Sequence, residues 1–123
     1  LFKHVVIQEV AYESLPYALR ATIHESVGRH LEAHAGDNVA PWLDLLAFHY
    51  DRSLHTDKRR HYLVAAGDAA RTAYAVPLAI SYYERALPLV QDAQRVDVLT
   101  HLGEVLEVAQ VVEGLPCGPR RPD

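Results

Sequence analysis

The sequence predicts an all-α fold of about six helices, arranged as antiparallel pairs. Apolar residues recur every three or four positions along most of the chain, and proline and glycine fall between these periodic stretches. Strand signals are weak: only residues 1–3 have the pattern of an extended segment, and no Asn-Gly or Asp-Gly pair closes a hairpin. These three observations together favour helices from end to end.

The first half of the chain is expected to hold three helices. Apolar residues over 5–15 predict a short helix that Pro16 ends. Pro16 also suits the first turn of the next helix, because its missing N–H would have no partner there. That second helix covers 17–35 and stops at Gly36, and Pro41 opens the third.

Three more helices are expected in the second half. The fourth is capped by Thr56 or Asp57 and ends near Tyr74. The fifth begins at Pro77 and kinks or ends around Pro88, because a proline inside a helix removes a hydrogen bond at a cost of about 3 kcal/mol. The last covers about 92–112.

Small and apolar residues between positions 63 and 86 have the spacing of one helix–turn–helix repeat. In this pattern Gly67 and Ala79 lie where two antiparallel helices meet, and Tyr83 fills the space that the small residues leave. The full set is Leu63, Ala66, Gly67, Ala70, Ala79, Tyr83 and Ala86. The spacing resembles the tetratricopeptide repeat, a binding scaffold with no chemistry of its own, and implies a right-handed solenoid fragment.

Part of this pattern occurs again 36 residues later, close to the repeat length of about 34 residues. The second copy consists of Leu99, Leu102, Gly103 and Leu106. We expect Gly103 to make the same close backbone contact as Gly67. No second helix follows, since residues 114–123 are rich in proline and glycine. The sixth helix is therefore expected to carry an uncovered apolar face, to be covered by another subunit through self-association or by a missing repeat.

The N-terminal half carries a second set of motifs. Residues 2–15 read Phe-Lys-His-Val-Val-Ile-Gln-Glu-Val-Ala-Tyr-Glu-Ser-Leu, and further motifs follow at Ile23-His24, Phe48-His49-Tyr50 and Tyr62-x-x-x-Ala66-Gly67-x-x-Ala70. In this order, over residues 2–109, they resemble the helical region of STAND-class signal-transduction ATPases. Such regions occur in bacterial proteins that join adenylate or guanylate cyclase domains to an ATPase, and in ATPase-type transcription regulators.

This resemblance implies a domain organisation and a role. Residues 1–56 would be a helical linker after a winged-helix-like ATPase portion, 57–113 a tetratricopeptide-like region and 114–123 a disordered tail. The module would be non-catalytic and cytoplasmic, and would bind other domains of a larger parent chain or a partner protein. The single cysteine, Cys117, fits a reducing compartment.

Catalytic and cofactor motifs are missing from the sequence. It has no Gly-x-x-x-x-Gly-Lys-Ser/Thr phosphate loop, no paired cyclase aspartates on strands and no Gly-x-Ser-x-Gly elbow. The net charge of −4 and the pI near 6.0 argue against nucleic acid and anionic membranes as partners. No stretch approaches the about 20 apolar residues that cross a bilayer. We therefore expect no enzyme activity, no cofactor and no membrane partner.

Eight histidines leave a metal-binding helical enzyme domain as an alternative. His30 and His34 are four residues apart and share a helix face, a spacing that can chelate zinc. His24 begins a metalloprotease-like pattern, but the second histidine of that motif is replaced by Gly28. We favour solvent exposure for His30 and His34, and partial burial with a hydrogen bond for His24 and His49.

A DNA-binding regulator segment is the other alternative. It would need a basic recognition helix, whereas the helix over 17–35 has Arg20 and Arg29 offset by Glu25 and Glu32. Binding to DNA at physiological salt is therefore not expected.

The aromatic residues divide into two expected groups. Trp42, Phe48, Tyr62 and Tyr83 are expected to pack in the core. Tyr74 and Tyr82 are expected to face a groove that binds a peptide or a partner helix.

Overall fold

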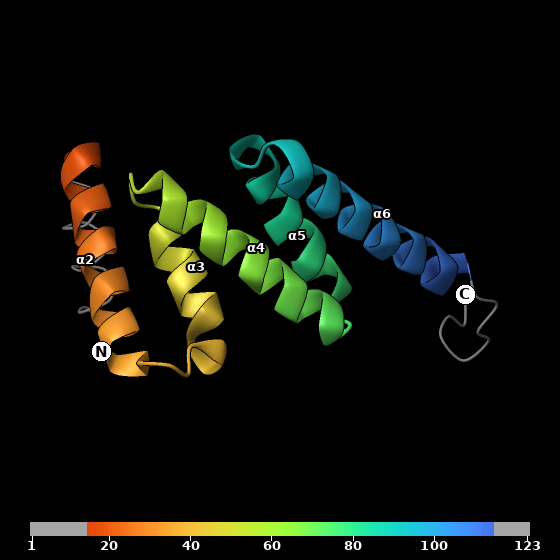
Figure 1. Cartoon of the computed structure of the whole chain (residues 1–123), viewed down its shortest axis with the longest axis horizontal. Coiled ribbons are helices and arrows are strands. Elements are labelled where there is room, and N and C mark those ends of the chain that lie inside the picture. The colour runs from red at the N-terminus through yellow and green to blue at the C-terminus, as the bar shows by residue number, and fades with distance from the viewer. Residues whose placement is uncertain (1–14, 115–123) are drawn as a thin grey trace, which may run out of the picture. The chain divides into compact units, whose positions relative to one another are not determined.

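The computed structural model describes residues 15–114, and all regular structure in this range is helical. The order is α2 (Tyr17–Ala35), the 3-10 turn η1 (Ala40–Trp42), α3 (Leu43–Asp51), α4 (Thr56–Thr72), α5 (Val76–Ala86), the 3-10 turn η2 (Leu87–Leu89) and α6 (Asp92–Gly114) (Figure 1). The predicted all-α class is confirmed for these residues. The helix expected over 5–15 and the expected tail lie outside them, apart from residues 15 and 114.

The contacts divide the chain into two compact units, Leu1–Tyr62 and Leu63–Asp123. α4 crosses this division after Tyr62, so its first turns belong to the first unit and its remaining turns to the second. No helix over residues 15–114 combines the length and the apolar composition that a membrane span needs.

In the first unit α2 packs against α3 (Figure 1). The predicted bounds of α2 are confirmed: the helix follows Pro16 and ends at Gly36, which has a left-handed φ of 60°. A Cβ atom on Gly28 would lie 2.6 Å from Cε2 of the buried Tyr50 ring. Glycine thus occupies position 28 because the ring leaves no room for a side chain, which explains why the metalloprotease pattern is broken there.

In the second unit the remaining turns of α4 pack with α5 and α6. A Cβ atom on Gly67 would lie 2.8 Å from Cε1 of Tyr83, whose side chain is completely buried. The close contact predicted between Gly67 and Tyr83 is observed, and Ala79, predicted at the same helix meeting, is completely buried. All other positions of the first repeat pattern are buried too: Leu63, Ala66, Ala70, Ala79 and Ala86. α5 ends at Ala86, directly before the turn that contains Pro88, as the proline predicted.

The second copy of the repeat pattern is only partly buried. Leu102 is buried, but Leu99 and Leu106 are 45% and 43% exposed. Nothing lies within 4 Å of a Cβ atom placed on Gly103. The expected close contact at Gly103 is therefore wrong for the described part of the chain, because no helix there covers this face of α6.

Candidate functional site

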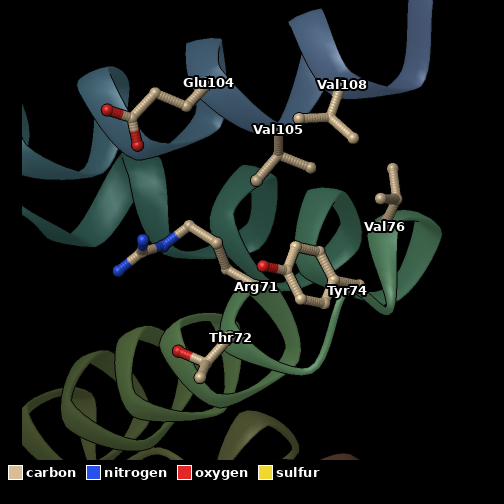
Figure 2. Close-up of a pocket in the computed structure, with 7 residues that line it drawn as sticks. All are labelled: Arg71, Thr72, Tyr74, Val76, Glu104, Val105 and Val108. Carbon is tan, nitrogen blue, oxygen red and sulfur yellow. The ribbon is translucent and has the colours of Figure 1, made fainter. Parts of the chain in front are cut away.

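The second unit has a pocket of about 350 Å³ at the end of α4. It is lined by Arg71, Thr72, Tyr74, Val76, Glu104, Val105 and Val108. Figure 2 shows valine side chains of α6 facing the Tyr74 ring, with the charged groups of Arg71 and Glu104 at the other end. The pocket can therefore take an apolar group beside a polar or charged one.

Backbone geometry places Tyr74 beside this pocket. α4 ends at Thr72, and Tyr74 follows with a left-handed φ of 61°. The N–H of Ala75 donates to the carbonyl oxygen of Ala70 at 2.9 Å, which closes the helix end in a Schellman-like cap. The Tyr74 side chain is 83% exposed, so its expected exposure is confirmed.

Tyr82, the other expected groove residue, is only 6% exposed, so that prediction is wrong. Tyr82 and Tyr83 are neighbours about 100° apart around α5, and both are buried because neighbouring elements cover α5 on more than one side. Arg85 lies over the Tyr82 ring, with its guanidinium carbon 5.1 Å from the ring centre. Tyr82 is thus a core residue and leaves Tyr74 as the aromatic residue at the pocket.

A polar cluster at the edge of the pocket fixes the position of Arg71. The Tyr83 hydroxyl donates to Oδ1 of Asp68 at 2.5 Å, and Nε of Arg71 donates to the Tyr83 hydroxyl at 3.1 Å. His101 Nδ1 lies 3.7 Å from the same Asp68 oxygen. Burial, helped by the bond to Asp68, raises the pKa of Tyr83 to about 12, so the phenol stays neutral and acts as a donor.

Sequence reasoning missed Asp68 and Arg71. They follow Gly67 by one and four residues, and both bond to the Tyr83 hydroxyl. Their spacing of three residues places them on the same side of α4. Two charged residues three positions apart, directly after a glycine at a helix contact, could have indicated this cluster from the sequence.

The first unit has a separate polar cluster around Glu32. Its carboxylate accepts hydrogen bonds from the Tyr50 hydroxyl at 2.9 Å, from Nζ of Lys58 at 2.6 Å and from the Tyr62 hydroxyl. Burial alone would raise the pKa of Glu32, but the hydrogen bonds, first that of Lys58, hold it below its usual value. The Tyr50 and Tyr62 rings stack with centres 5.4 Å apart. This cluster joins α2, α3 and the start of α4, which is a structural role.

The histidines behave largely as expected. Nδ1 of His24 lies 3.0 Å from Nδ1 of His49, and burial lowers the pKa of both rings. Their partial burial and hydrogen bond are thereby confirmed. His30 and His34 are exposed on α2. Over residues 15–114 no three histidine, cysteine or carboxylate side chains are gathered as metal ligands would be, so this pair has no third ligand there.

The expected aromatic core is confirmed at two of four positions. Tyr62 and Tyr83 are buried and Trp42 is half-buried, its ring edge-on to His34 at 5.2 Å. Phe48 is exposed, so its expected burial is wrong. The guanidinium carbon of Arg52 lies 3.7 Å from the centre of the Phe48 ring and gives it a cation–π contact at the surface.

One side of α6 is apolar and exposed. Val96, Leu99, Gly103 and Leu106 are all exposed and follow one another at spacings of three, four and three residues. This spacing aligns them along one side of a helix, as in the contact line of a coiled coil. We call these four residues the outer stripe.

No protein-family model, no curated protein and no solved structure matches this chain.

Proposed function

We propose that this chain is a non-catalytic protein-interaction module, built as a tetratricopeptide-like solenoid fragment. The observation that supports it most is the buried contact of Tyr83 with Gly67, at the positions that the repeat spacing specifies. The outer stripe adds an exposed apolar surface of helical length, the kind of surface that binds a partner helix.

The motif order over residues 2–109 supports a context for this module. It is that of the helical region of a STAND-type signal-transduction ATPase, linked to an adenylate or guanylate cyclase or to a transcription regulator. In this context the chain is cytoplasmic, and it transmits a signal by docking other domains of its parent or a partner protein. The polar clusters at Glu32 and Asp68 keep each helix contact rigid, so that the exposed faces are presented in fixed form.

A display selection tests the proposal. The folded chain is offered a yeast-displayed library of amphipathic helices, and enriched helices are measured again with a Leu99→Gln/Leu106→Gln variant. We expect helices to be enriched and the variant to lose their binding. Leu54→Gln is the matched control, because Leu54 is an exposed leucine of the first unit.

Two results would contradict the proposal. One is a folded chain that enriches no helix above background. The other is a set of enriched helices that bind the double variant as well as they bind the original chain.

A further inference from the structure

We propose that the pocket of the second unit binds a free α-amino acid with an apolar side chain, in its zwitterionic form. Arg71 holds the carboxylate, Glu104 holds the ammonium group, and the apolar side chain lies between valines and the Tyr74 ring. This is a small-molecule site and goes beyond the protein contact proposed above. The lining residues of α6, at positions 104, 105 and 108, lie on a different side of that helix from the outer stripe.

The size of the pocket favours a ligand as small as one amino acid. Its volume of about 350 Å³ is near the lower end of the range for ligand pockets, about 300–1,000 Å³. Nucleotides and larger cofactors are thereby disfavoured. The lining residues come from the end of α4, the start of α5 and the middle of α6, all in one compact unit, so the pocket is formed within a single packed body.

The position of Arg71 suits it to a carboxylate. Its Nε donates to the Tyr83 hydroxyl at 3.1 Å, which fixes one side of the guanidinium group. Oδ1 of Asp68 accepts from the Tyr83 hydroxyl and lies 3.9 Å from Nη2 of Arg71, too far for a hydrogen bond. The end of the guanidinium group therefore retains donors for a ligand. Two parallel N–H groups of a guanidinium bind a carboxylate strongly and in a defined orientation.

Glu104 supplies the opposite charge at the same end of the pocket (Figure 2). Its charge acts on Arg71, since it helps the hydrogen bond to Tyr83 to raise the pKa of Arg71. Within the described part of the chain, however, no ion pair of 4.0 Å or less joins the two side chains. A ligand with both charges can bind between them. A plain carboxylic acid would be repelled by Glu104, and a plain amine by Arg71.

The other end of the pocket favours an apolar side chain. Val105 is buried and Val108 is 42% exposed, and both face the ring of Tyr74 (Figure 2). The left-handed φ of Tyr74 places this ring as the outer wall, where it is largely exposed to water. Val76 completes this end, which carries no charged residue among its lining. An apolar group inserted there removes valine and tyrosine surface from water.

The test titrates L-leucine into the full chain with isotope-labelled valine methyl groups. We expect the signals of Val76, Val105 and Val108 to shift together and to saturate, and that of Val96, an exposed valine of α6 outside the pocket, to stay unchanged. L-Alanine has the same charges and almost no side chain, so it should bind about tenfold more weakly. No shift of the pocket valines with up to about 10 mM leucine would overturn the inference.

Two derivatives of leucine test the two charges separately. Leucinamide lacks the carboxylate and N-acetylleucine lacks the ammonium group, so each should bind about tenfold more weakly than leucine. If N-acetylleucine binds as tightly as leucine, the occupant is the carboxyl end of a peptide. If leucinamide does so, the occupant is an amine. Either result would overturn the inference.

Variants of the chain complete the test. Glu104→Gln keeps the size of the side chain, and should weaken leucine binding about tenfold and remove the preference for leucine over N-acetylleucine. Glu107→Gln is the matched control, because Glu107 is exposed on α6 outside the pocket lining. Tyr74→Gly should also weaken binding, and since glycine relieves the left-handed φ, unfolding would not explain that loss.

The variants can also contradict the inference. Unchanged leucine binding by Glu104→Gln would remove Glu104 from the site. An equal loss of binding in Glu107→Gln would show a general effect of charge on α6. Unchanged binding by Tyr74→Gly would remove the ring from the site.

Discussion

In each unit a tyrosine ring packs against a glycine of a neighbouring helix: Tyr50 of α3 against Gly28 of α2, and Tyr83 of α5 against Gly67 of α4. The Tyr50 ring lies where a side chain on Gly28 would be, and the Tyr83 ring does the same at Gly67. In both cases the hydroxyl reaches a carboxylate: Glu32 for the first and Asp68 for the second. The ring fixes the distance between helices, and the hydroxyl fixes its orientation.

Removing the Tyr83 hydroxyl tests this account at a single atom. Tyr83→Phe keeps the ring on Gly67 but leaves Asp68 and Arg71 without their shared partner. We expect a loss of about 1–2 kcal/mol in the free energy of unfolding, measured by chemical denaturation. Tyr74→Phe is the control and should change little, because that side chain is 83% exposed. Equal effects of the two substitutions would contradict a structural role for the Tyr83 hydroxyl.

The His24–His49 pair makes stability depend on pH. Burial lowers the pKa of both rings below the value of 6.5 that histidine has in the unfolded chain. Below pH 6.5 the unfolded chain therefore binds more protons than the folded one, and stability falls as the pH falls toward the lowered pKa values. Arg52 and Arg20 near His24 act in the same direction.

Denaturation curves at pH 7.5, 6.5 and 5.5 (about one unit to either side of the unfolded value) measure this dependence. The free energy of unfolding should decrease along the series, and His24→Gln/His49→Gln should flatten the decrease. The exposed pair His30→Gln/His34→Gln should leave it in place. A decrease that survives the first double substitution would assign the pH dependence to other groups.

At the scale of elements, the sequence predicted helix bounds well where proline or glycine sets them locally. Pro16 and Gly36 bound α2, and Pro88 follows the end of α5. The end of α4 carries no such signal: the helix stops at Thr72, and a tyrosine takes the left-handed position that glycine usually occupies.

Tyr74→Gly tests the strain at this helix end. A left-handed conformation costs a side-chain-bearing residue about 1–2 kcal/mol relative to glycine. Because the ring is exposed, its loss removes little packing, so Tyr74→Gly should raise the free energy of unfolding by about 1 kcal/mol. Tyr74→Ala removes the ring and keeps the strain, and should give no gain. A stabilising Ala variant would show that the ring itself, and not the backbone, is unfavourable.

At the scale of the whole molecule, stability and binding are expected to rest on different residues. Leu99 and Leu106 are about half exposed, so Leu99→Gln/Leu106→Gln should lower the free energy of unfolding by no more than about 1 kcal/mol. The same variant should lose helix binding. Thermal unfolding followed by circular dichroism measures the change in stability. A variant that unfolds at room temperature would place these leucines in the core instead.

The candidate surface could be predicted from the sequence only in part. The pattern of Leu99, Leu102, Gly103 and Leu106 shows that α6 can receive a helix, but the pattern is the same whether or not a helix is present. The exposure of Tyr82 and of Phe48 was also predicted wrongly from the sequence. Periodicity gives the side of a helix on which a residue lies, whereas burial depends on how many neighbours cover that side.

The central claim is that Gly67 receives the ring of a second helix, whereas the equivalent Gly103 has no such neighbour. The most direct test makes the same substitution at both glycines. Gly67→Ala places a methyl group against the Tyr83 ring, and Gly103→Ala places it in open space. Overpacking costs about 1–3 kcal/mol, and alanine gains up to about 1 kcal/mol over glycine in a helix. The account predicts that Gly67→Ala lowers the free energy of unfolding while Gly103→Ala raises it slightly. Equal shifts in the same direction would contradict it.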